Sequence, residues 1–178
     1  MNILTIDFET YYTKEYGLNK LTTEEYIRDP RFEVIGVAVK NFGQELSSRK
    51  ARAPVWFSGS KKQIAKFLAQ FDWDNSIAVA HNAMFDMAIL NWHFGIKPAK
   101  IVDTLAMSRA IHSIEVGGSL AALSEYYELG RKGTEVHDAI GKKRLDFTAE
   151  ELEAYGGYCV QDVELTYKLF NVLKKDFP

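Results

Sequence analysis

Two carboxylates one residue apart, Asp7 and Glu9, stand at the end of an apolar run near the start of the chain. Residues 3–8 alternate as in a β-strand, and side chains two apart in a strand point the same way, so the two carboxylates are predicted to be adjacent. Adjacent like charges at the edge of a core need a cation, a proton or water to balance them. The pair therefore indicates either a metal site or two solvated charges at a strand end.

Three further polar side chains, Asp86, Tyr158 and Asp162, lie on predicted helices at positions where they could take part in a metal or catalytic site. Asp86 follows an apolar segment and lies in the first turn of a predicted helix, where the helix dipole stabilises a carboxylate. Tyr158 and Asp162 are four residues apart on the last predicted helix and therefore share one face. Asp162 is near the apolar stripe of that helix, where an unpaired carboxylate is costly. Each position alone also fits a purely structural role.

The hydrophobic pattern predicts strands that come first and then alternate with helices. Strands are expected at 3–8, 34–39, 54–57, 77–80 and 101–103, and helices at 22–29, 60–71, 83–95, 104–112, 119–127 and from 148 onward. This order predicts an α/β fold, a mixed central sheet with helices packed on its faces. A sequence without an internal repeat, a low-complexity stretch or a Pro-rich linker is expected to form one domain over residues 1–178.

Three segments with turn-forming residues interrupt this pattern. Residues 41–43 are expected to form a turn, and Gly156-Gly157 is expected to bend or break the last helix. Residues 130–147 have weak periodicity and three glycines, which predicts a long surface loop with one short helical piece.

Length and composition limit the class of protein. With 178 residues, 47% of them hydrophobic, the chain suffices for one soluble domain with a substantial core. A net charge of −2 excludes a generic basic nucleic-acid binder, although bound metal ions and local basic patches can reverse the field at a site. The single cysteine excludes an internal disulfide and a thiolate metal cage. A cytoplasmic location without membrane contact is expected, because no signal-like segment or membrane-length apolar run is present.

In chain order, these residues resemble the three motifs of the DEDDy 3′–5′ exonucleases of the DnaQ-like, ribonuclease H-like superfamily. Asp7, Glu9 and Thr10 match the first motif, Asp-x-Glu-Thr. Asn82 and Asp86 match the second, Asn-x-x-x-Asp, with the aromatic Phe85 before the Asp. Tyr158 and Asp162 match the third, Tyr-x-x-x-Asp. The histidine variant of the family has His five residues before the last Asp, where this chain has Gly157. In particular, the chain is similar to the proofreading domain of family A DNA polymerases, including those encoded by phages.

The resemblance implies a ribonuclease H-like fold with helices on both faces of the sheet, and a metal-dependent 3′–5′ exonuclease that hydrolyses single-stranded DNA ends to 5′-mononucleotides. It implies two divalent cations, Mg²⁺ or Mn²⁺, because all-oxygen ligands suit hard ions. Asp7, Glu9 and Asp162 would hold one ion, and Asp7, aided by Asp86 through water, would hold the other. Tyr158 would orient the attacking water. The implied partners are a single-stranded DNA 3′ end and a polymerase domain or subunit.

The resemblance also implies residues that contact the terminal nucleotides. Thr10, His81, Asn82 and Phe85 are the expected contacts, with a structural role as the equal alternative for His81. Tyr11 and Tyr12 follow the first motif and could either stack on bases or pack locally.

Other functions remain in view at this point. An exoribonuclease of the same fold would use the same carboxylates, so the motifs do not separate DNA from RNA. A degenerate, non-catalytic domain that binds nucleic acid or a polymerase is disfavoured by the complete set of four acidic residues. A dinucleotide-binding oxidoreductase has no support, because no Gly-x-Gly-x-x-Gly follows a strand. The motifs fit both a stand-alone nuclease and a domain of a longer polymerase.

Overall fold

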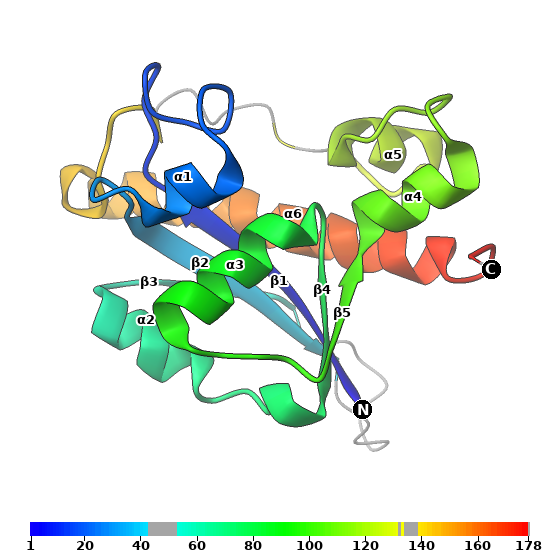
Figure 1. Cartoon of the computed structure of the whole chain (residues 1–178), viewed down its shortest axis with the longest axis horizontal. Helices are drawn as coiled ribbons and strands as arrows, with labels where there is room; N and C mark the ends of the chain where they lie inside the picture. The colour runs from blue at the N-terminus through cyan, green and yellow to red at the C-terminus, as the bar shows by residue number, and fades with distance from the viewer. Residues whose placement is uncertain (43–52, 132, 134–138, 178) are drawn as a thin grey trace.

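A mixed sheet forms the centre of the molecule (Figure 1), in a computed structural model that describes residues 1–42, 53–131, 133 and 139–177. Within these residues, five strands are ordered β3-β2-β1-β4-β5. Their bounds are β1 Asn2–Thr10, β2 Val34–Phe42, β3 Val55–Ser58, β4 Ser76–Ala80 and β5 Lys100–Asp103. The central strand β1 pairs antiparallel with β2 and parallel with β4. The edge strand β3 pairs antiparallel with β2, and the edge strand β5 pairs parallel with β4. The predicted mixed sheet is confirmed.

Helices cover both faces of this sheet, as predicted. Their bounds are α1 Thr23–Arg28, α2 Lys61–Leu68, α3 Ala83–Phe94, α4 Thr104–His112, α5 Leu120–Tyr126 and α6 Ala149–Leu173, with 3₁₀ helices at Trp73–Asn75 and Arg144–Asp146. In Figure 1, α2 and α3 lie in front of the sheet and α6 runs behind it, with α4 and α5 packed near the C-terminal end of α6. None of the described helices is long and apolar enough to cross a membrane.

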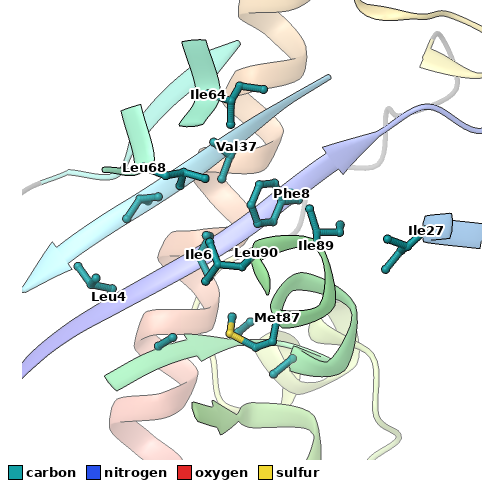
Figure 2. Packing of buried hydrophobic residues seen from close by; sticks show 14 of the residues in the cluster. Leu4, Ile6, Phe8, Ile27, Val37, Ile64, Leu68, Met87, Ile89 and Leu90 are labelled. Atoms are coloured by element: carbon teal, nitrogen blue, oxygen red, sulfur yellow. The ribbon is translucent and has the colours of Figure 1, made fainter. Parts of the chain in front are cut away.

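The alternation of β1 divides the core into two layers. Leu4, Ile6 and Phe8 are buried between the sheet and helices α2 and α3, where they meet side chains of those helices (Figure 2). On the other face, Ala38 of β2 packs with Cys159 and Val163 of α6. Residues of β1 that alternate with the first three therefore face α6, and Asp7 is one of them.

Helix starts follow the sequence closely, because their signals are local. Capping boxes at Thr22, Ser60 and Thr148 begin α1, α2 and α6, as their spacing predicts. The helix predicted at 60–71 ends earlier, at Leu68, whose carbonyl accepts a 2.8 Å hydrogen bond from the indole of Trp73. The short helical piece predicted within 130–147 is the 3₁₀ helix Arg144–Asp146, while residues 132 and 134–138 of that loop lie outside the described residues.

Two predicted interruptions are wrong because tertiary contacts override local preference. Asn41 and Phe42 were expected in a turn but belong to β2, where they pair with Leu4 and Ile3, and Gly43 lies outside the described residues. Helix α6 runs from Ala149 to Leu173 as one helix, so Gly156-Gly157 does not break it.

Gly156 is present for close packing and not for helix termination. A Cβ atom at Gly156 would lie 2.4 Å from Nε1 of Trp56, and one at Gly36 on β2 would lie 2.2 Å from Cη2 of the same indole. The indole is therefore seated between two glycines of different elements. A Cβ atom at Gly157, the exposed neighbour of Gly156, would meet nothing within 4 Å.

The two glycines should respond oppositely to alanine. Gly156→Ala should destabilise the protein by about 1–3 kcal/mol, the usual cost of overpacking a core. Gly157→Ala should stabilise it by up to about 0.5–1 kcal/mol, because alanine loses less backbone freedom in a helix interior. Urea unfolding of both variants in metal-free buffer measures the difference, and equal stabilities would contradict the close approach of Trp56 to Gly156.

Candidate active site

The candidate site begins where the pairing of β1 with β4 ends. Their parallel register runs from Asn2–Ser76 to Thr5–Val79, and β1 continues to Thr10. Asp7 and Glu9 lie in this extension, past the carboxyl end of the parallel pairing. Crevices beyond the carboxyl ends of parallel strands are frequent ligand sites in α/β proteins.

Asp86 reaches this part of β1 from α3. The backbone N–H of Phe8 donates a 3.0 Å hydrogen bond to Asp86 Oδ1, and the Asp86 side chain is buried, with 2% of the residue exposed. Burial and the negative charge of Asp7 raise the pKa of Asp86 well above its usual range, against the opposing effect of the Phe8 hydrogen bond. The structure thus brings Asp7 and Asp86, which are far apart in the sequence, together in an arrangement that a cation would stabilise.

The third predicted motif lies on the helix that packs against Asp7. Tyr158 and Asp162 are both half-buried on α6. Between them, the buried Cys159 places its Sγ 3.4 Å from Asp7 Oδ2. Asp162 is three residues beyond Cys159 and so occupies the neighbouring turn of the same helix.

A glycine of the loop before α6 contacts the predicted catalytic tyrosine. A Cβ atom at Gly133 would lie 2.6 Å from Cδ1 of Tyr158, so the ring packs directly on this backbone. The side chain of Gln161, on the same helix, donates a hydrogen bond to the carbonyl of Arg131. Arg131 and Gly133 are therefore both in contact with the part of α6 that carries Tyr158.

Sequence reasoning missed two α6 residues that contact the strand carboxylates. Ligand atoms of Asp7, Glu9 and Cys159 all lie within 4.8 Å of one another. Tyr155 is buried and hydrogen-bonded to Glu9 through its side chain. The signal that could have found them is their four-residue spacing on the helix that bears the third motif.

Two of the predicted nucleotide contacts line a cavity of about 590 Å³. Thr10 and Phe85 are on its wall, together with aromatic and basic side chains: Tyr12, Tyr26, Lys14 and Lys20. The hydroxyls of Thr10 and Tyr26 are 2.8 Å apart. Burial raises the pKa of Tyr12, and the negative charge of Glu9 raises it further. The cavity wall that contains Tyr12 is therefore close enough to Glu9 to feel its charge.

Asn82 and His81 occupy the tight connection between β4 and α3. Asn82 is exposed, has the left-handed backbone angles φ 63° and ψ 53°, and donates its N–H to Asp103 Oδ1 at 3.0 Å. Asparagine tolerates this conformation better than most residues. Both ring nitrogens of His81 are engaged, one at 2.9 Å from Thr104 Oγ1 and the other at 2.9 Å from the carbonyl of Gly118. These bonds favour the structural role among the two predicted for His81.

The chain belongs to a family of 3′–5′ exonucleases. The model of this family matches residues 22–178, most of the chain, and it begins after the strand that carries Asp7 and Glu9. A comparison with curated proteins finds no match. The chain is therefore a phosphodiester hydrolase of the exonuclease class.

Several solved structures share the fold. Brucella melitensis NrnC bound to pGG superposes with a TM-score of 0.64 at 19% identity, over 97% of this chain and 72% of that chain. The same protein with bound Mg²⁺ gives 0.58 at 19% identity over the same shares of the two chains, 97% and 72%. Trypanosoma brucei RNase D in complex with RNA U12 gives 0.67 at 13% identity, over 96% of this chain and 55% of that chain. The predicted ribonuclease H-like fold is confirmed.

Proposed function

We propose that this 3′–5′ exonuclease is a DEDDy enzyme that hydrolyses single-stranded DNA from the 3′ end to 5′-mononucleotides, as the proofreading domains of family A DNA polymerases do. The observation that supports it most directly is that Asp7 of the first motif, Asp86 of the second and the helix that carries the third come together at one end of β1. Asp86 is buried against the backbone of Phe8, beside Asp7, and α6 packs on the opposite side with Tyr158 and Asp162. Clusters of like-charged carboxylates with raised pKa values are typical of functional sites.

The donor set fits two hard divalent cations. Carboxylate oxygens from four acidic residues are the ligands that Mg²⁺ and Mn²⁺ prefer. Burial, followed by the charges of Asp7 and Glu9, raises the pKa of the Cys159 thiol well above its usual range, so the nearby sulfur stays protonated and does not compete as a thiolate. We assign Asp7, Glu9 and Asp162 to one ion, and Asp7 with water-mediated help from Asp86 to the other.

The side chains around the ions would divide the remaining work of phosphodiester hydrolysis. When bound, the two ions would activate water, neutralise the phosphate and stabilise the leaving 3′ oxygen. The hydroxyl of Tyr158 would orient the attacking water, with its ring fixed against Gly133. Such positioning matters because a reacting group held in line lowers the entropic part of the barrier.

The cavity next to the carboxylates is the proposed site of the terminal nucleotide. Its volume of about 590 Å³ suits a nucleotide-sized group, and Thr10 and Phe85 line it as the resemblance implies. Tyr12 offers an aromatic surface on which a base can stack, which any base sequence allows. Exposed Lys14 and Lys20 at this cavity would attract the phosphate backbone. Asn82 would contact the nucleotide from the exposed start of α3.

An exoribonuclease of the same fold is the second candidate. The observation that favours it is that structurally similar proteins, RNase D and NrnC, have been solved with RNA U12 and with pGG. Hydrolysis of either nucleic acid would use the same carboxylates. The two functions differ in how the terminal sugar is accommodated, because only RNA has a 2′-hydroxyl.

Matched oligonucleotides of DNA and RNA test this proposal. The purified chain with Mg²⁺ or Mn²⁺ should shorten single-stranded DNA from its 3′ end, release 5′-mononucleotides and lose all activity in EDTA. Faster digestion of the RNA would establish the second candidate instead. Internal fragments, or equal digestion of a 3′-blocked oligonucleotide, would contradict the 3′–5′ polarity. Binding of both oligonucleotides without hydrolysis of either would indicate a non-catalytic domain.

A further inference from the structure

Two buried side chains of α6 contact the carboxylates of β1 but belong to none of the three motifs. Tyr155 is 4% exposed and Cys159 is 0% exposed. They are four residues apart, so they lie one turn apart on one face of the helix. Helix α6 therefore presents this pair, Tyr155 and Cys159, to the carboxylates of β1.

Cys159 contacts Asp7 at two atoms. Its Sγ is 3.4 Å from Oδ2 of the carboxylate and 3.3 Å from the carbonyl oxygen of the same residue. An ionised carboxylate and a carbonyl oxygen can only accept, so the thiol is the donor. A thiol is a weak donor, but Cys159 is buried and its thiol is the α6 group that contacts Asp7.

Tyr155 makes the second contact, with Glu9. Its side chain is hydrogen-bonded to Glu9, and its hydroxyl donates because the carboxylate accepts. The ring is stacked on Phe147 with 5.5 Å between ring centroids and meets Trp56 edge-on at 6.4 Å. Trp56 is itself seated on Gly156 of the same helix. The packing of the ring against Phe147 and Trp56 therefore restricts the direction of the Tyr155 hydroxyl.

The spacing of the pair matches the spacing of the carboxylates. Four residues of an α-helix rise about 6 Å, and two residues of a strand rise about 6.7 Å. Tyr155 meets Glu9 and Cys159 meets Asp7, so the helix runs antiparallel to the strand and keeps both contacts in register.

We propose that Tyr155 and Cys159 are positioning residues that hold the side chains of Glu9 and Asp7 in the orientation in which they bind the metal ions. This inference rests on the proposed two-metal function. Outer hydrogen-bond partners that orient metal-binding carboxylates commonly affect metal affinity or activity by about 10–100-fold. The expected defect is in metal binding, because neither side chain is assigned to the substrate.

Three variants test the two contacts separately. Tyr155→Phe keeps the ring between Phe147 and Trp56 and removes only the hydroxyl. Cys159→Ala removes the thiol, whereas Cys159→Ser keeps a donor at the same place. Tyr167→Phe is the matched control on α6, since its ring packs on Phe42 and Lys40, away from the strand carboxylates. Mn²⁺ binding is titrated directly for each protein, and the Mg²⁺ dependence of the rate is measured in parallel.

Tyr155→Phe should raise the dissociation constant for Mn²⁺ and the half-saturating Mg²⁺ concentration by about 10-fold or more. Cys159→Ala should raise both by a smaller factor, Cys159→Ser should restore most of the loss, and Tyr167→Phe should match the wild type. Unchanged Mn²⁺ binding in Tyr155→Phe, or a serine variant as weak as the alanine variant, would overturn the proposal. If a cysteine variant does not fold, Tyr155→Phe alone decides. A wild-type protein that binds no Mn²⁺ would instead refute the two-metal function.

Discussion

Asp86→Asn should abolish nearly all exonuclease activity and at the same time raise the melting temperature of the metal-free protein. Asparagine has the same shape and can still accept the N–H of Phe8, which lies 3.0 Å from Asp86 Oδ1. It cannot ionise, so no negative charge can form in this buried position beside Asp7. Loss of one group that stabilises charge in a transition state typically costs about 10²–10³-fold in rate, and a metal-linked carboxylate should cost at least this much.

The stability gain should depend on pH with a definite sign. Because the pKa of Asp86 is raised in the folded protein, the folded state keeps a proton that the unfolded chain releases. This contribution to stability is complete below the ordinary aspartate range and is lost as pH rises toward the raised pKa. The advantage of Asp86→Asn over the wild type should therefore grow from acidic to neutral pH in the absence of metal.

Thermal unfolding in EDTA across this pH range, together with rates on a single-stranded oligonucleotide, tests both halves of the prediction. Asp74→Asn is the matched control, because Asp74 is an exposed aspartate at the start of a 3₁₀ helix. Mg²⁺ should stabilise the wild type more than the Asp86→Asn variant, since a ligand that binds the folded state more tightly stabilises it more at the same concentration. A metal-free variant that melts well below the wild type would show that Asp86 is a structural residue.

Tyr158→Phe should slow hydrolysis by up to about 10²–10⁴-fold if the hydroxyl both orients water and assists proton transfer. Phenylalanine keeps the ring, which packs on Gly133, so stability should change little. A residual rate should remain because the carboxylates that would hold the ions are intact. Affinities for Mn²⁺ and for DNA should also change little, because the hydroxyl is not assigned to either.

Single-turnover rates at saturating metal isolate this effect from binding. Asp162→Ala, measured beside it, should lose metal affinity as well as rate, which distinguishes a ligand from a water-orienting group. Tyr126→Phe is a suitable control, since Tyr126 is an exposed tyrosine of α5. Wild-type rates for Tyr158→Phe would make Tyr158 a packing residue, and the chain would lose the feature that assigns it to the tyrosine subclass.

The amino-acid sequence by itself determined the elements and the three motifs, because both depend on short-range spacing. Capping boxes at Thr22, Ser60 and Thr148 begin three helices, and each box is formed within four consecutive residues. Alternation in β1 places Asp7 and Glu9 on one face, and a four-residue spacing places Tyr158 and Asp162 on another.

Tertiary structure decided the contacts between distant segments, which no local pattern encodes. Gly156-Gly157 has the local signature of a helix break. In the folded protein, however, the indole of Trp56, 100 residues earlier in the chain, fills the space that a side chain at Gly156 would need. Likewise, Cys159 lies against Asp7, which is 152 residues away in the sequence. Such contacts arise only when α6 packs on the sheet, because burial selects residues by the space and partners available and not by their neighbours in sequence.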